Sequence, residues 1–178
     1  VGNPPYQMAT GGSKSQATPL YDKFISQSIK LNPRYLTMII PSRWYSGGFG
    51  LNEFRKNMLK DKRISHLIDF TDSSMCFPGV QIKGGVCYFL WEKEYDGGCL
   101  VKNIFSDKSS NILKRPLLEK GSEVFIRYNN SVDVYRKVRK FKEESFKKFV
   151  SSQKPFGLPT NFKISNNNKE ITIYGNKT

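Results

Sequence analysis

The sequence predicts an α/β fold that forms the second half of a doubly wound sheet and finishes in a β-hairpin. Helical and strand patterns alternate through the first part of the chain, which is the first observation behind this prediction. The second is the apolar run Tyr35–Ile40, which has the length and composition of a strand buried on both faces. The third is a charged helical pattern over 123–149, which predicts a basic helical segment after the sheet.

The chain opens with a rigid loop and continues into an amphipathic helix. Pro4 and Pro5 remove two backbone donors and fix φ, so this stretch cannot lie inside a helix or a central strand. Further along, Thr18 offers an N-cap with Pro19 at the first helical position. Apolar residues then recur at helical spacing, and we expect the helix to run through Leu31.

Strands and a second short helix follow in alternation. The expected elements are a strand at Tyr35–Ile40, a helix between Leu51 and Leu59, and strands at Ile64–Phe70, Val86–Glu94 and Cys99–Phe105. The last two strands either pair as the hairpin or continue the sheet. The composition changes between Asp107 and Pro116, which predicts a boundary between residues 1–107 and 108–178.

The composition excludes wholesale disorder and points to a polyanionic partner. Hydrophobic residues make up 38% of the chain and aromatic residues 13%. Lys and Arg total 29 against 15 Asp and Glu, which gives a formal net charge of +14. Nucleic acid is the first candidate, and a solvated basic surface is the alternative. Basic residues interleaved with aromatic ones over 136–149 favour the nucleic acid.

The cysteines and the apolar runs indicate where the protein works. Cys76, Cys87 and Cys99 are odd in number and lack CxxC spacing, so neither a disulfide framework nor a metal site is expected. A reducing cytoplasm fits this pattern. No apolar run reaches the length of a membrane span, so we expect no membrane partner. Because the chain starts at Val1 without an initiator Met, we expect it to be a piece of a longer protein.

The opening loop has the composition of a site that binds a planar amino group. The side-chain oxygen of Asn3 and the carbonyl of Pro4 can accept both hydrogens of such a group, which localises its lone pair for attack. Tyr6 adds a flat surface for stacking. No histidine or carboxylate base is needed for this chemistry. Alternatively, Asn-Pro starts an ordinary turn, or Pro-Pro-Tyr is a polyproline ligand.

Two stretches carry a resemblance to a known family. VGNPPY resembles motif IV of the amino-group methyltransferases that act on adenine N6 in DNA. Residues 69–94, DFTDSSMCFPGVQIKGGVCYFLWEKE, resemble the Phe-Pro loop and following hairpin of adenine methylases from bacterial restriction-modification systems. PSRWYSGG and KPFGLPTNF are similar to the same group. The resemblance is most specific over roughly the first 105 residues.

The resemblance implies a function and a set of site residues. It implies site-specific methylation of adenine N6 in double-stranded DNA with the adenine flipped out, with a restriction endonuclease domain or subunit as a possible partner. Asn3, Pro4, Pro5 and Tyr6 match the catalytic motif, and Tyr6 and Phe77 match the residues that stack on the extruded base. Residues 1–107 then form a partial catalytic domain, and 108–178 a hinge and the start of a target-recognition region.

The resemblance also implies S-adenosylmethionine as the cofactor. In the family, the glycine-rich loop and the acidic residue that bind it precede the NPPY segment, and this chain has neither. We therefore expect the C-terminal half of a Rossmann-like, S-adenosylmethionine-dependent methyltransferase sheet that starts at motif IV. No cofactor-binding residue is expected within the chain, and the chain alone is expected to be inactive.

Other functions stay open at this point. NPPY also serves enzymes that methylate RNA bases or a glutamine amide of a protein, and a non-catalytic DNA-recognition module is a further alternative. The high positive charge argues against a protein substrate. We interpret Asp69 and Asp72 as strand-end caps. Trp44, Tyr45 and Phe49 either stack on bases or cover the edge of the sheet. Candidate DNA contacts are Lys14, Arg43, Lys83, Arg136, Lys140 and Lys154.

Overall fold

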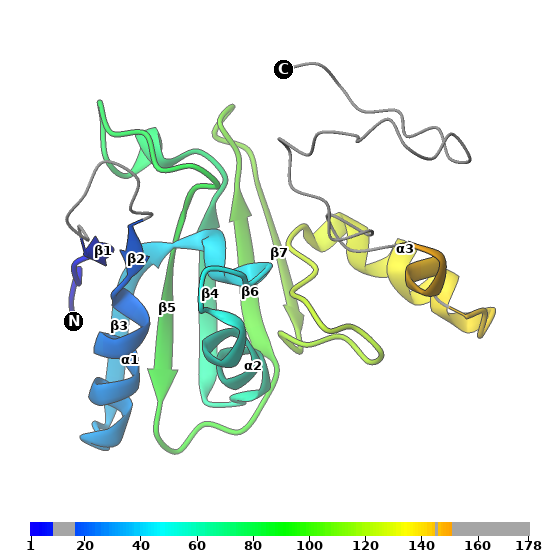
Figure 1. Cartoon of the computed structure of the whole chain (residues 1–178), viewed down its shortest axis with the longest axis horizontal. Coiled ribbons are helices and arrows are strands. Elements are labelled where there is room, and N and C mark those ends of the chain that lie inside the picture. The colour runs from blue at the N-terminus through cyan, green and yellow to red at the C-terminus, as the bar shows by residue number, and fades with distance from the viewer. Residues whose placement is uncertain (9–16, 145, 151–178) are drawn as a thin grey trace, which may run out of the picture. The chain divides into compact units, whose positions relative to one another are not determined.

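The structure is a computed structural model that describes residues 1–8, 17–144 and 146–150. The chain divides into two units, Val1–Phe141 and Lys142–Thr178 (Figure 1). The described part of the second unit holds a 3₁₀ turn at Phe146–Phe149, in which the two terminal rings lie 5.7 Å apart. Lys14, Lys154 and the KPFGLPTNF stretch lie outside the described residues.

The first unit is built on a mixed five-stranded sheet with the order β3-β5-β4-β6-β7. Only β4 and β6 are parallel, and the other three neighbouring pairs are antiparallel. The strands are β3 (Tyr35–Pro41), β4 (Ile64–Phe70), β5 (Val86–Glu92), β6 (Cys99–Ile104) and β7 (Ser110–Arg115). The first four confirm the strands expected from the sequence.

Of the two alternatives for the last predicted strand, β6 continues the sheet and does not form a hairpin with β5. β5 lies between β3 and β4, and β6 instead runs parallel to β4 on the other side of it. The hairpin is formed by β6 with β7, a strand that the sequence analysis did not identify. β7 lies at the edge of the sheet and is exposed at alternate positions. An edge strand of this kind tolerates a mostly polar sequence, here SNILKR.

The sheet also continues past Asp107, where the sequence predicts a boundary. β7 pairs with β6 along its whole length, and the compact unit extends to Phe141. The helix α3 (Asn129–Lys140) belongs to this unit and contacts β6 and β7. That residues 108–178 act as a hinge and recognition region stays a prediction.

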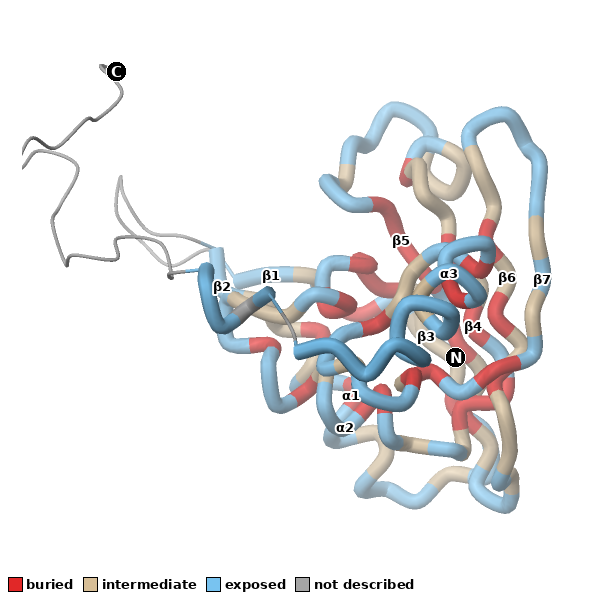
Figure 2. The backbone as a smooth tube through the Cα atoms, turned by 90° about the vertical axis from the view of Figure 1, so that its right-hand side faces the viewer, coloured by how far each residue is buried: buried red, intermediate tan, exposed pale blue. Residues whose placement is uncertain are grey.

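Two helices cover one face of the sheet (Figure 1). α1 (Tyr21–Lys30) lies over β3, and α2 (Asn52–Lys60) lies over β4 and β6. Buried positions, red in Figure 2, concentrate in the strands and the helix surfaces that face them. Ile25, Met58, Leu67, Phe89 and Trp91 are each at most 2% exposed in this core. In a doubly wound sheet the helices lie on both faces. Because α1 and α2 lie on the same face, they do not reproduce this feature of the predicted fold.

The opening loop is attached to the sheet. Gly2 pairs in parallel with β3, donating to the carbonyl of Thr37 at 3.0 Å and accepting from the amide of Ile39 at 3.1 Å. Because the pairing is parallel, the residues after Gly2 continue toward the carboxyl end of β3. The site residues Asn3 to Tyr6 therefore lie at that edge of the sheet, as the position of ligands in α/β folds predicts.

The helix start expected at Thr18 is wrong. Thr18 and Pro19 form a short strand, β2 (Thr18–Pro19), which pairs antiparallel with β1 (Gln7–Met8). The helix instead begins at Tyr21, and Leu20 precedes it without a side-chain cap. In the described residues, no helix is long and apolar enough to cross a membrane.

Candidate functional site

A cavity of about 640 Å³ lies at the carboxyl end of β3. We call it the NPPY cavity because Asn3, Pro5 and Tyr6 line it. Phe77 and Lys83 also line it, and they come from the loop between β4 and β5. The NPPY segment and the loop that carries Phe77 are far apart in the sequence, but the structure brings them to the same cavity. The sequence predicted both as parts of a single site. Their catalytic and binding roles stay predictions.

The NPPY loop is anchored on both sides of the residues that would contact a ligand. Gly2 is bonded to β3, and the carbonyl of Tyr6 accepts from the amide of Leu20 at 3.1 Å. Pro4 is buried, whereas Asn3 is exposed. The fixed backbone therefore leaves the amide side chain of Asn3 available to a ligand in the cavity.

Tyr6 presents a neutral aromatic ring to the cavity. Its ring is partly buried, and its hydroxyl has no hydrogen-bond partner among the described residues. Burial raises the pKa of Tyr6 to about 12, and the nearby Cys87 and Cys76 thiols act in the same direction. The phenol therefore stays protonated over the whole physiological range, which suits stacking on an uncharged base.

The loop that carries Phe77 is organised around one serine. The hydroxyl of Ser73 donates to the carbonyl of Val80 at 3.0 Å and accepts from the amide of Ile82 at 2.8 Å. The carbonyl of Ser73 also accepts from the amide of Phe77 at 2.9 Å. These bonds fold the loop onto itself and hold the half-buried ring of Phe77 against the NPPY cavity.

A second cavity of about 430 Å³ adjoins this region, and we call it the rim cavity. Arg43 and Lys83 line both cavities. Arg43 lies in the 3₁₀ turn Ser42–Tyr45 that follows β3, and its guanidinium carbon lies 3.6 Å from the centroid of the Phe49 ring. The remaining residues of the rim cavity are Ser42, Tyr45, Ser46, Gly84, Val124, Phe125 and Arg127.

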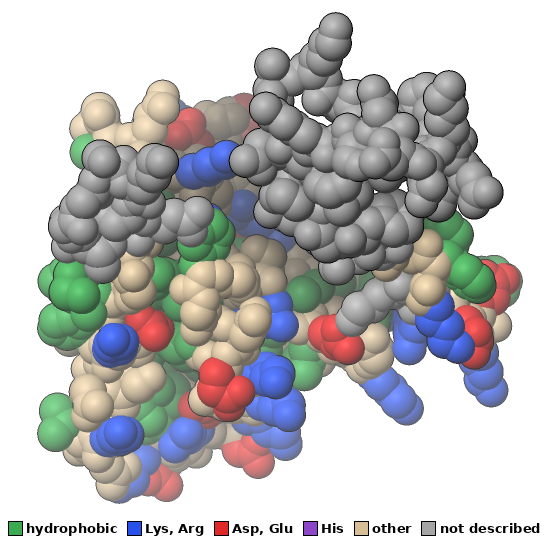
Figure 3. All heavy atoms as spheres, in the orientation of Figure 1, with side chains coloured by type: hydrophobic (Ala, Val, Ile, Leu, Met, Phe, Trp, Pro, Cys, Tyr) green, Lys and Arg blue, Asp and Glu red, His purple; other side chains and the backbone are tan. Residues whose placement is uncertain are grey.

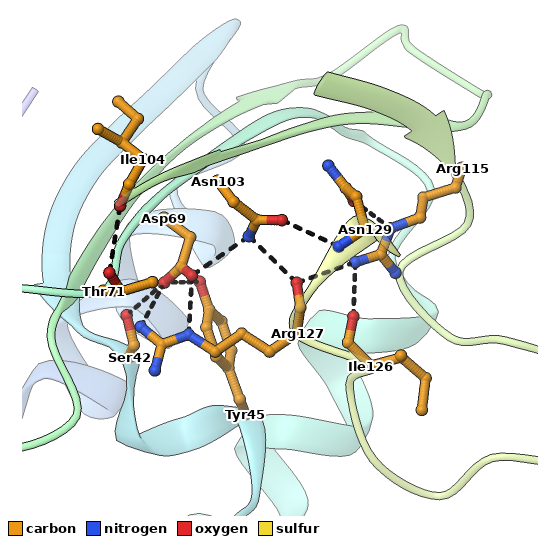
Figure 4. A network of polar contacts seen from close by, with 10 residues as sticks. All are labelled: Ser42, Tyr45, Asp69, Thr71, Asn103, Ile104, Arg115, Ile126, Arg127 and Asn129. Atoms are coloured by element: carbon orange, nitrogen blue, oxygen red, sulfur yellow. Dashed lines mark hydrogen bonds and ion pairs between the residues drawn. The ribbon is translucent and has the colours of Figure 1, made fainter. Parts of the chain in front are cut away.

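A buried carboxylate beneath the rim cavity organises the polar groups around it (Figure 4). Asp69 is 0% exposed and lies near the end of β4. Arg127 donates two hydrogen bonds to it, at 2.8 and 2.9 Å. The remaining donors are Ser42 at 3.0 Å, Tyr45 at 3.2 Å and Asn103 at 3.4 Å.

This network was not predicted from the sequence. Asp69 accepts from four side chains rather than capping the strand, so the interpretation of Asp69 as a cap is wrong. Asp72 instead accepts from the amide of Ser74 at 2.9 Å and caps the 3₁₀ turn that follows β4. Burial opposes the charge of Arg127, but the hydrogen bonds and attraction of Asp69 outweigh it and raise the pKa of Arg127. An aspartate at a core-facing position of an apolar strand was the available signal, since a buried charge needs a partner.

A buried arginine, Arg115, fixes the start of α3. Arg115 is 2% exposed and donates to the side chain of Asn129 at 2.9 Å and to the carbonyl of Ile126 at 2.6 Å. Asn129 in turn donates to the carbonyl of Val101 in β6 at 2.8 Å. The segment that carries Arg127 is therefore held to the sheet from both sides.

The other predicted residues have different surroundings. Arg136 donates two hydrogen bonds of 3.0 Å to Glu119, whose carboxylate is buried, so its charge is already paired. Lys140 is exposed near the end of α3. Trp44 and Tyr45 are 0% and 5% exposed and belong to the core, which excludes base stacking for these two rings. Phe49 is 47% exposed, so both interpretations of its ring stay predictions.

Figure 3 shows Lys and Arg side chains interspersed with Asp and Glu across the face of the molecule seen in Figure 1. On the visible part of this face formed by described residues, the positive charge is therefore not gathered into one patch. Within the described residues, no group of His, Cys, Asp and Glu side chains is arranged to hold a metal ion.

Two glycines in the loops after β3 and before β5 are crowded by the protein's own atoms. A Cβ on Gly47 would lie 2.5 Å from side-chain atoms of both Arg55 and Asn52, and the amide of Gly48 donates to Asn52 at 3.0 Å. A Cβ on Gly85 would lie 2.1 Å from the carbonyl of Phe70, so this glycine serves close packing. Neither Gly47 nor Gly85 therefore opens a cradle for S-adenosylmethionine.

Comparison with known proteins points to DNA-modifying methylases. Residues 1–77 match the Eco57I restriction-modification methylase family. The chain is 31% identical, over 167 residues, to a protein of Mycoplasma pneumoniae named "Uncharacterized adenine-specific methylase". The match covers 88% of this chain and 40% of that protein, so the chain spans well under half the length of this relative. The resemblance to N6-adenine methyltransferases of restriction-modification systems is therefore confirmed.

Two solved structures show weaker likeness. One is the methyltransferase subunit of a type I restriction-modification system from Streptococcus thermophilus, with 16% identity, a TM-score of 0.31, and coverage of 62% of this chain and 21% of that one. The other is from a study of the assembly and conformational transition of a type I system, with 14% identity, a TM-score of 0.42, and coverage of 78% and 28%. Similarity at this level carries no argument about function.

Proposed function

We propose that the protein containing this chain transfers a methyl group to N6 of adenine in double-stranded DNA, as part of a restriction-modification system. The observation that carries the proposal is the NPPY cavity, which Asn3, Tyr6 and Phe77 line together. Its volume of about 640 Å³ falls within the range of pockets that enclose small organic ligands. An extruded adenine fits both its size and its aromatic lining.

The chain's own residues would hold and activate the amino group of that base. The Oδ1 atom of Asn3 and the carbonyl of Pro4 accept its two hydrogens, which keeps the nitrogen lone pair out of the ring and available for bond formation. Tyr6 and Phe77 supply the rings on which the base stacks. The anchored backbone around Pro4 makes the two acceptors ready before the base arrives.

S-adenosylmethionine, the donor that the family implies, supplies the methyl group. Its binding residues lie outside this chain in the proposal, which the crowding of Gly47 and Gly85 by the protein's own atoms supports. The chain alone is then inactive. A restriction endonuclease domain or subunit is the proposed partner, and the cytoplasm is the proposed location.

Phe77→Ala tests the role of the cavity in the full-length protein. We expect weaker retention of the extruded adenine, with a loss of about 1–3 kcal/mol in stacking, because the ring lining the cavity is removed. The loss should be largest when the target adenine is well paired, since extrusion then costs the most. Methylation is measured by mass spectrometry of N6-methyladenine on paired and mismatched target duplexes.

Phe24→Ala is the matched control, because Phe24 is a partly exposed phenylalanine on α1 that does not line the cavity. It should methylate both duplexes at the wild-type rate. Normal extrusion and methylation by Phe77→Ala would contradict the stacking role. A wild-type protein that modifies RNA or protein but never DNA adenine would contradict the proposed function itself.

The exposed cations of α3 are proposed to contact the DNA backbone. Replacing Lys137 and Lys140 with glutamine should weaken binding about equally for all sequences. The slope of log K against log salt should become shallower by about 0.9 for each phosphate that the variant no longer neutralises. The same change at Lys23 and Lys30 on α1 is the control. An unchanged slope in the α3 variant would make this helix an ordinary solvated surface.

A further inference from the structure

The rim cavity and the NPPY cavity meet at two cationic side chains. Arg43 and Lys83 line both cavities, and each lies in a loop at the same edge of the sheet. A ligand whose flat part fills the NPPY cavity must therefore leave it beside these two cations. We propose that the rim cavity binds the phosphodiester group adjacent to the extruded nucleotide. This inference rests on the proposed function and adds a second binding site to it.

The lining of the rim cavity suits a single negative charge. Arg43 and Lys83 are both exposed, and none of the described residues that line the cavity is acidic. Arg127 also lines it, but its charge is compensated by the two hydrogen bonds to Asp69. Arg127 therefore forms a wall of the cavity, and two cations are left for the anion. A guanidinium and an ammonium are the groups that proteins use most often for phosphate.

The guanidinium of Arg43 is restrained before any ligand binds. It lies over the ring of Phe49 at 3.6 Å, which limits its rotamers while leaving the edge of its plane free to donate. On either side of Arg43 in the chain, Ser42 and Tyr45 donate to the buried carboxylate of Asp69 (Figure 4). Asp69 is thus a positioning residue, because it fixes the turn from which Arg43 projects.

The backbone beside Lys83 is also open to a close approach. Gly84 lines the rim cavity with a φ of +93°, and a Cβ at this position would have nothing within 4 Å. The positive φ requires a glycine here, and the absence of a side chain leaves the main chain open to a bulky ligand. A sugar–phosphate chain, which the proposed function brings to this edge of the sheet, can therefore pass close to it.

A DNA duplex with one neutral phosphate tests the proposal in the full-length protein. Each phosphate next to the target adenine is replaced in turn by an uncharged methylphosphonate, and the Kd is measured. For one of these positions, wild-type binding should weaken by about tenfold, since a charge-assisted hydrogen bond is removed. In Arg43→Gln the same DNA change should cost less than about threefold, because the partner of the phosphate is already absent. Lys83→Gln should behave in the same way.

Arg34→Gln is the matched control. Arg34 is also exposed and also lies over an aromatic ring, that of Tyr35, but it precedes β3 at the opposite end of the strand from Arg43. This variant should retain the full tenfold effect of the neutral phosphate. A tenfold effect that persists in both Arg43→Gln and Lys83→Gln overturns the phosphate site. So does a wild-type protein that is indifferent to every flanking phosphate.

The proposed function is checked separately in the same samples. Formation of N6-methyladenine on the unmodified duplex by the wild-type protein supports it. The wild-type protein could methylate DNA while the effects on Kd of the neutral phosphate and of the protein substitutions were additive. In that case only the proposed phosphate site would be wrong. If no methylation occurs on any DNA, the proposed function fails, and the phosphate site loses its basis with it.

Discussion

Replacing Asn3 with alanine in the full-length protein should lower kcat for methyl transfer by about 10²–10³ while leaving the Kd for DNA nearly unchanged. The reason is that one of the two acceptors for the amino hydrogens is removed, and a single preorganised polar group of this kind contributes about that much to rate. Asn3 is exposed on an anchored loop, so its replacement should not disturb the fold. Single-turnover methylation under saturating DNA measures the effect.

Asn57→Ala is the control for this prediction. Asn57 is an exposed asparagine on α2 and lines a cavity distinct from the NPPY cavity. The variant should methylate DNA at the wild-type rate. If Asn3→Ala did so as well, the motif would serve as a turn and the proposed chemistry would be wrong. If Asn3→Ala bound DNA more weakly but kept the wild-type kcat at saturating DNA, Asn3 would contribute to binding rather than to catalysis.

Replacing Arg127 with leucine should destabilise the sheet domain by about 3–5 kcal/mol. Asp69 is 0% exposed and would lose the ion-pair partner that now donates two hydrogen bonds to it. Ser42, Tyr45 and Asn103 would continue to donate, but none of them carries a compensating charge. Urea unfolding followed by fluorescence of the buried tryptophans measures the change.

Two further variants separate charge from packing. The double change Arg127→Leu with Asp69→Asn should recover part of the stability, because the unpaired charge is then removed. Lys62→Leu breaks an ion pair with Asp96 in which both side chains are largely exposed, and it should have no measurable effect. An Arg127→Leu protein as stable as the wild type would show that Asp69 does not need its partner.

The local elements could be predicted because neighbouring residues determine them. Tyr35–Ile40 and Ile64–Phe70 are apolar runs bounded by turn residues, and both are strands in the structure. The helix predicted between Leu51 and Leu59 is also present as α2. Thr18 was misassigned because a good N-cap residue is equally suited to a strand, and its pairing with Met8 decided between them.

The chemistry that we propose for the opening loop was likewise inferred from the sequence alone. Two prolines between Asn3 and Tyr6 restrict the backbone whatever surrounds them, so the positions of an acceptor and a ring follow from covalent geometry. The resemblance of residues 69–94 to the Phe-Pro loop of adenine methylases predicted that Phe77 belongs to the same site. That Phe77 lines the NPPY cavity required the tertiary structure, because the loop after β4 had to reach the edge where Gly2 joins β3.

Only the tertiary structure decided the strand order and the buried charges. Strand order depends on pairings between distant segments, and β7 is too polar to be recognised before its place at the edge is known. Asp69 and Arg127 are 58 positions apart, and neither lies in a motif that predicts the other. Their pairing follows from desolvation: once the fold buries the carboxylate, the charged group that can reach it becomes its partner.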